Sequence, residues 1–169
     1  MDLYEAIRKR SSMRAYLDKP VEEDKLGRIL EAGRLAPSAR NRQEWKFIVV
    51  RDAKVRQQLA GASGQPFVGQ APVVIAAVGL TPNDTMHCGI PADPVDCAIA
   101  LEHFALAATA EGLGCCWIGH FDQDACRKIL NVPSSAKIIE LMPIGYPDAP
   151  LRERTRKPLH QVVCYDKFH

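Results

Sequence analysis

Residues 95–122 read VDCAIALEHFALAATAEGLGCCWIGHFD, and no other part of the chain says as much about how it folds. Apolar side chains cover almost the whole circumference of a helix predicted over about 93–111, interrupted by Glu102 and His103. A helix that is apolar all round is buried, either in a core or beneath a partner subunit. Glycines then end the helix, and a buried strand is expected at 115–118.

Outward from this stretch, helical and strand patterns alternate along the chain. Three further buried strands are predicted at 45–50 (WKFIVV), 72–78 and 136–144. Further helices are expected at 2–10, from Pro20 to Gly33, after Asp52 and from Asp122 to Leu130, with a loop at 79–93. Helices packed on a central sheet make the class α/β or α+β. We expect one domain over 1–169 whose irregular, basic tail begins at about 148.

Composition narrows the class of protein. The chain has 169 residues, 47% hydrophobic and 25% charged, which suits one soluble globular domain. The net charge is +2 with no basic stripe, so no nucleic-acid partner is expected. No apolar run approaches the roughly 20 residues that span a bilayer, and the acidic N-terminus does not resemble a secretory signal.

Most of the six cysteines lie in apolar runs, where a thiol behaves as a small hydrophobic side chain. A reducing, cytoplasmic location is therefore expected. His87, Cys88, Cys97 and His103 match no common zinc spacing, so we expect no metal.

Three segments carry polar groups suited to a ligand. Residues 10–14 (RSSMR) hold two guanidinium and two hydroxyl groups that suit a phosphate, although a solvated basic helix end fits them equally well. Residues 36–45 form a turn whose Ser and Asn side chains could bind a ligand or cap local backbone groups. Residues 112–122 place Gly119 at a strand end, where it allows a flat ligand to approach or serves the turn alone. No GxGxxG fingerprint is present.

Six segments together resemble the nitroreductase family of FMN-dependent oxidoreductases, in particular its shorter members. In chain order they are RKRSSMRAY, APSARNRQEWKF, QAPVVIAAVG, residues 95–122, LMPIGYP and RTRKPL. The resemblance implies an α+β sandwich with a mainly antiparallel central sheet, a homodimer and one FMN per interface. It also implies hydride transfer from NADH or NADPH through the flavin to an oxidised acceptor of the nitroaromatic, quinone or flavin type.

The resemblance assigns FMN-binding roles to residues in four segments: Arg10, Ser11, Ser12 and Arg14; Pro37, Ser38 and Asn41; Ile118 and Gly119; Arg154 and Arg156. It implies that Arg10, Arg154 and Arg156 hold the phosphate, with Arg14 nearer the pyrimidine edge of the flavin. The 37–41 loop would reach the partner's flavin, and a backbone N–H at 118–119 would lie near the flavin N5.

The chain departs from the family where an acidic residue often precedes the ring-side glycine. Here Ile118 stands before Gly119, so the acceptor pocket is expected to differ. No catalytic acid or base is assigned, because the cofactor carries the redox chemistry. Two alternatives remain open at this point: an FMN-binding sensor or storage module with little turnover, and a specialised flavin reaction such as reductive dehalogenation.

Overall fold

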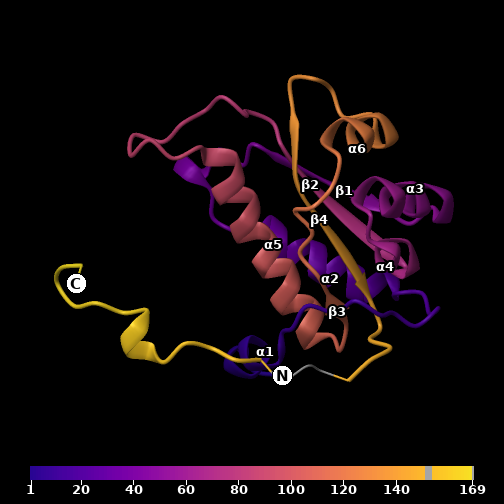
Figure 1. The fold of residues 1–169 in the computed structure, drawn as a ribbon, viewed down its shortest axis with the longest axis horizontal. Helices are drawn as coiled ribbons and strands as arrows, with labels where there is room; N and C mark the ends of the chain where they lie inside the picture. The colour runs from indigo at the N-terminus through magenta and orange to yellow at the C-terminus, as the bar shows by residue number, and fades with distance from the viewer. Residues whose placement is uncertain (151–153, 169) are drawn as a thin grey trace.

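The computed structural model describes residues 1–150 and 154–168 of the chain, drawn in Figure 1. Its helices and strands follow one another as α1 Leu3–Lys9, α2 Glu23–Arg34, η1 Ala39–Asn41, β1 Trp45–Val50, α3 Ala53–Ser63, α4 Pro66–Gln70, β2 Val73–Gly79, α5 Ala92–Ala110, β3 Gly114–Cys115, α6 Gln123–Leu130, β4 Lys137–Gly145 and η2 Leu159–Gln161.

The four strands form one antiparallel sheet in the order β1-β2-β4-β3. Every residue of β2 is buried, because this strand has neighbours on both edges and helices on both faces. The register between β2 and β4 shifts between Ala77 and Val78, where a bulge interrupts the ladder. The predicted α+β class with a mainly antiparallel central sheet is confirmed.

Helices cover both faces of the sheet and enclose two apolar clusters (Figure 1). On one face α2 and α5 pack together, and Phe104 of α5 meets Phe47 of β1 edge to face at 4.8 Å. On the other face α3, α4 and α6 surround Leu59, Val68 and Leu141. Among the described residues, no helix has the length and apolar character needed to cross a membrane.

Aspartates begin three of the helices. Asp2, Asp52 and Asp122 each accept a hydrogen bond from the backbone amide three residues later, at 2.8, 3.0 and 2.8 Å. Each satisfies an amide that the helix itself leaves unpaired, which typically contributes about 1 kcal/mol. These contacts explain why the helix starts expected at these aspartates are found there.

Two sequence predictions about elements need correction, and one short α-helix was missed. The second helix begins at Glu23 rather than Pro20, and Glu22 just before it still has an extended backbone. The short helix α4, over residues 66–70, was not predicted. The strand expected at 115–118 is only Gly114–Cys115. Its ladder is interrupted because Cys116 donates to the Pro143 carbonyl, and a proline has no amide to donate back.

Candidate functional site

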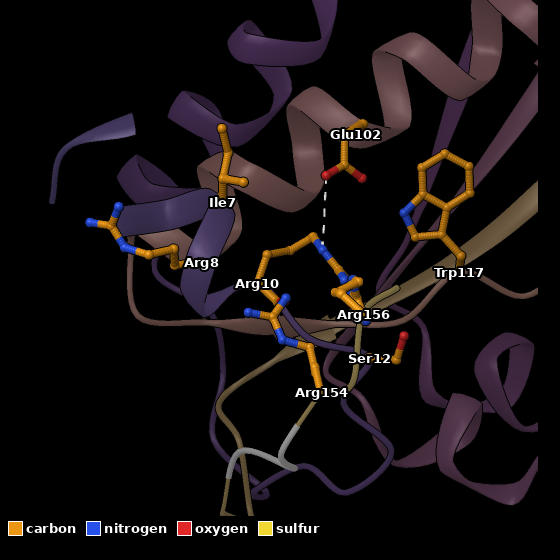
Figure 2. Close-up of a pocket in the computed structure, with 8 residues that line it drawn as sticks. All are labelled: Ile7, Arg8, Arg10, Ser12, Glu102, Trp117, Arg154 and Arg156. Atoms are coloured by element: carbon orange, nitrogen blue, oxygen red, sulfur yellow. Dashed lines mark hydrogen bonds and ion pairs between the residues drawn. The ribbon is translucent and has the colours of Figure 1, made fainter. Parts of the chain in front are cut away.

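An open cavity of about 740 Å³ lies where the two ends of the chain meet α5 (Figure 2). The residues that line it are Ile7, Arg8, Arg10, Ser12, Glu102, Trp117, Arg154 and Arg156. They come from α1 and the segment after it, from α5, from the segment after β3 and from the C-terminal segment. Stretches that are far apart in sequence therefore share one concave surface.

The N-terminal side of the cavity is fixed by the end of α1. Arg10 is the last residue joined to the helix: its amide donates to the Ala6 carbonyl at 2.8 Å, and its backbone then turns to an extended conformation. The following segment runs beside β3, where the Met13 amide donates to the Cys115 carbonyl at 2.8 Å and Ser12 bridges to the same residue. Arg10 and Ser12 are thus held close to Trp117.

The C-terminal segment returns to this side of the molecule. The guanidinium of Arg154 donates to the backbone carbonyl of Arg10, which lies 144 residues earlier in the chain. Arg156 lines the same cavity, and Figure 2 shows both side chains beside Arg10. The structure therefore brings together Arg10, Ser12, Arg154 and Arg156, four of the residues to which the resemblance gives FMN-binding roles.

Positive charge dominates the cavity. Its lining holds four arginines and one carboxylate, Glu102, whose Oε1 lies 3.9 Å from Nε of Arg10. Burial raises the pKa of Glu102, and the neighbouring charges of Arg10 and His103 oppose that rise. Burial, together with the charges of Arg10 and Arg156, lowers the pKa of Arg154. Guanidinium groups gathered in this way are suited to a dianionic group such as a phosphate.

Ser11 and Arg14 belong to the same predicted segment but do not line this cavity. Ser11 is buried and lines a separate, smaller cavity with Lys9 and Thr109. The Arg14 side chain is exposed. Successive side chains along an extended segment point to opposite sides, which explains why Ser12 enters the larger cavity and Ser11 does not.

The strand end at Ile118 and Gly119 lies just beyond Trp117. Ile118 exchanges two backbone hydrogen bonds with Leu141, at 2.9 and 3.1 Å, so its amide is already used. Gly119 is exposed, and its amide has no hydrogen-bond partner among the described residues. Of the two residues, only Gly119 offers an unused N–H to a ligand.

The loop that carries Pro37, Ser38 and Asn41 lies away from the cavity, beside the first turns of α5. The Ala39 amide donates to both carboxylate oxygens of Asp96, at 3.0 and 3.1 Å. Arg40, Asn41 and Gln43 all have φ near +55°, a conformation that non-glycine residues rarely adopt. Three such residues so close together indicate a loop whose shape is held against local preference, as often occurs at functional sites.

Four further residues lie at or near the site but were not predicted as site residues from the sequence. They are Arg8, Glu102, Trp117 and Glu140. Glu102 gave a signal, since it interrupts an otherwise apolar helix. Glu140 gave none, because it reaches Gly119 only through the pairing of separate strands. Within the described ranges, no group of three or more His, Cys, Asp or Glu side chains is placed to hold a metal ion.

Comparison with known proteins gives consistent results along most of the chain. The model of the nitroreductase family matches residues 7–66 and 60–146. A Thermus thermophilus protein named NADH dehydrogenase is 32% identical over an alignment 197 positions long, which covers 98% of this chain and 96% of the relative.

Solved structures agree in fold. A nitroreductase family protein from Clostridium novyi superposes with a TM-score of 0.84 at 33% identity, covering 90% of this chain and 89% of the other. A Clostridium difficile protein described as an FMN-dependent nitroreductase superposes with a TM-score of 0.83 at 29% identity, covering 96% and 98%.

Proposed function

The chain belongs to the nitroreductase family, and from this premise we propose that it is an oxidoreductase that uses FMN to pass hydride from NADH or NADPH to an oxidised acceptor. The acceptor expected is a small molecule of the nitroaromatic, quinone or flavin type. The observation that carries the proposal is the convergence of arginines from both ends of the chain on one cavity.

The cavity fits the phosphate of FMN. A phosphate monoester carries nearly two negative charges at neutral pH and needs several charge-assisted donors when it leaves water. Arg10, Arg154 and Arg156 supply guanidinium donors, and Ser12 supplies a hydroxyl. These are the residues that we assign to the phosphate.

The neighbouring surface fits a flat ring. Trp117 lines the same cavity and offers an aromatic side chain, and Gly119 offers an exposed amide and has no side chain of its own. An amide in this position can donate to a ring nitrogen of the flavin. We assign Gly119 to the ring side, with Ile118 fixing its place in the sheet.

The protein's contribution to the reaction is to bind and orient its ligands. When bound, FMN accepts hydride from the nicotinamide and gives it to the acceptor. The arginines would hold the phosphate in the cavity. Gly119 follows Trp117, which lines the cavity, and Ile118, which the sheet fixes, so its amide would donate to the ring from beside the cavity. Because NAD(P)H and acceptor would use one open face in turn, ping-pong kinetics are expected.

We further propose that the active form is a homodimer in which the 37–41 loop serves the partner's flavin. Pro37, Ser38 and Asn41 do not line the cavity of their own chain. Ser38 accepts from the Gln43 amide at 3.0 Å, and Asp96 holds the Ala39 amide, so the loop is rigid yet exposed. A rigid, strained loop far from its own site is suited to a neighbouring subunit.

Apolar surface supports the same assembly. One side of α5 is buried in the core, but Val95, Ile99 and Leu106 on other sides are only half-buried in the single chain. Beside them, α1 exposes Leu3 and Tyr4. Apolar side chains clustered on adjacent helices mark an interaction surface. A second copy of the chain would complete the burial that the composition of this helix predicts.

We also propose a reducing, cytoplasmic location. Cys97, Cys115, Cys116 and Cys126 are buried thiols in the two apolar clusters, and burial raises the pKa of each. Such thiols are structural and inert. The alternative of an FMN sensor or storage module is not favoured, because the relatives carry the names of oxidoreductases and dehydrogenases.

The proposal is tested by two measurements on the full chain, an absorption spectrum after incubation with FMN and stopped-flow mixing with nicotinamide nucleotides. The absorption spectrum is expected to show bound flavin, about one per chain. Anaerobic stopped-flow mixing with NADH and with NADPH is expected to bleach the flavin band rapidly with at least one of them. Bound flavin that neither nucleotide bleaches would identify a binding module. A chain that binds no flavin would refute the cofactor assignment itself.

A further inference from the structure

Glu140 is an unusual residue for its position in the sheet. It lies in β4, which runs between β2 and β3, and it pairs with Ala77 of β2. Ala77 and Met142 both belong to the apolar cluster beneath α5, and residues two apart in a strand share a face. Glu140 therefore places a carboxylate on the α5 side of a central strand, where apolar residues are the rule.

The carboxylate has no partner. It makes no hydrogen bond or ion pair within residues 1–150 and 154–168, although it is only half-exposed. Burial alone raises its pKa, with no contribution from a charged side chain. A partly buried acid without a compensating cation lowers stability when ionised, so its presence points to a functional role.

The position of Glu140 connects it with the proposed ring side of the site. A Cβ placed on Gly119 would lie 3.5 Å from Oε1 and 3.7 Å from Oε2 of Glu140. The carboxylate thus lies beside the one residue of the strand end that offers an unused amide.

Resting on the proposed function, we infer that Glu140 is the acid that protonates the acceptor while hydride reaches it. Reduction of a quinone to a hydroquinone consumes one hydride, supplied by NAD(P)H through the cofactor, and one proton. In this step the Oε–H bond of Glu140 breaks as an O–H bond forms on the quinone oxygen. The carboxylate then regains a proton from water before the next turnover.

The surroundings favour this role because they keep the acid protonated to a higher pH than usual. Ala77 faces Glu140 from β2 and carries no charge, and the Cys116 thiol is the titratable group coupled to it from the segment after β3. A bound ring and acceptor would exclude more water and raise the pKa of Glu140 further. General acids are most effective when their pKa lies near the working pH.

The test compares wild type with Glu140→Gln, which keeps the shape of the side chain but cannot donate an acidic proton. The variant is expected to bind FMN within about 2-fold of wild type and to be reduced by NAD(P)H at the same rate. Its reoxidation by 1,4-benzoquinone at pH 6 is expected to be about 100-fold slower. Reoxidation by ferricyanide, which takes electrons without a proton, is expected to be unchanged.

The pH profile provides a second criterion. Reoxidation of wild type by the quinone should slow as pH rises through the pKa of Glu140, and the variant should show no such decline. Glu31→Gln, which removes an exposed charge that pairs with Arg34 on α2, should behave as wild type and serves as the control.

A measurement that does not depend on turnover completes the design. Carbon-13 NMR of glutamate-labelled protein follows the Glu140 carboxyl, assigned by its absence in the Glu140→Gln spectrum. Its midpoint should lie above that of exposed glutamates in the apoprotein and rise when FMN binds. An unchanged midpoint on FMN binding, or an equal loss of ferricyanide and quinone rates, would overturn the role of Glu140. Failure of the wild type to bind FMN would instead refute the proposed function.

Discussion

Arg10 and Arg156 come from opposite ends of the chain and line the same cavity, which makes the phosphate assignment testable by single substitutions. Replacing either by Ala is expected to weaken FMN binding by about 2–4 kcal/mol, as for loss of one partner of a buried charge pair. Riboflavin, which lacks the phosphate, should bind almost as before. Titration of both ligands into the apoprotein measures the effect.

The control for this prediction is Arg34→Ala. Arg34 is an exposed residue of α2 whose guanidinium pairs with Glu31, and it does not line the cavity. It should leave both affinities unchanged. Equal losses for FMN and riboflavin in the Arg10 or Arg156 variants would show that these residues support the fold rather than the phosphate.

Glu102 introduces a pH dependence into the same cavity. Its ionised carboxylate repels a phosphate and competes for Arg10, whereas the protonated form does neither. Burial raises its pKa above the usual value, so it protonates earlier as pH falls. At about pH 8 Glu102→Gln should bind FMN roughly 5-fold more tightly than wild type, equivalent to about 1 kcal/mol.

The ratio of the FMN dissociation constants of wild type and Glu102→Gln reports the effect of Glu102 alone, because the phosphate titrates equally with both proteins. The ratio should fall toward one as pH drops through the Glu102 pKa. Weaker binding by the variant at all pH values would show that Glu102 serves instead to orient Arg10.

Among the elements, α2 packs against α5, and a glycine permits their close approach. A Cβ on Gly33 would lie 1.9 Å from Cε1 of Phe104, whereas one on Gly27 would meet nothing within 4 Å. Gly33→Ala is therefore expected to lower the free energy of unfolding by about 1–3 kcal/mol through overpacking. Gly27→Ala should raise it by about 0.5–1 kcal/mol, because alanine favours a helix over glycine.

Urea unfolding of the two variants checks this prediction. Both carry the same substitution, glycine to alanine, in the same helix, so they differ only in what surrounds the added methyl group. If Gly33→Ala were as stable as Gly27→Ala, the ring of Phe104 would have to move without cost. The apolar cluster beneath α5 would then be less tightly packed than its fully buried residues indicate.

The elements that the sequence predicted well are those specified by local pattern. β1 and β2 were expected from continuous apolar runs, and the three capping aspartates marked helix starts. β3 was predicted too long because Pro143, which interrupts its ladder, is distant in sequence. Helix ends and strand lengths that depend on a partner strand are not encoded locally.

At the scale of the whole molecule, the resemblance to the nitroreductase family predicted more of the site than the local residue patterns did. It predicted that Arg10 and Arg156 act at one site, and the structure places them on one cavity. It could not show that Ser11 lines a different cavity, nor that Glu140 lies beside Gly119. Those facts depend on side-chain direction and on strand pairing, which appear only once the chain is folded.

The C-terminal arm, residues 157–168, bears on the assembly of the whole molecule. Figure 1 shows this segment passing α1 and projecting from the body of the protein. It exposes Leu159, Val162, Tyr165 and Phe168, the last with 98% of its surface accessible. Apolar side chains presented in this way are costly in water unless another surface covers them.

We therefore expect the full chain to be a dimer at micromolar concentration and the arm to stabilise it. A chain ending at Lys157 keeps Arg154 and Arg156 but loses the apolar residues, so its dimer should dissociate at concentrations at least about 10-fold higher, or roughly 1.4 kcal/mol. Tyr165→Ser with Phe168→Ser should shift the equilibrium in the same direction without shortening the chain. Sedimentation equilibrium measures both. A full-length chain that is a folded, FMN-loaded monomer at micromolar concentration would refute the dimer, and with it the assignment of Ser38 and Asn41 to a partner's flavin.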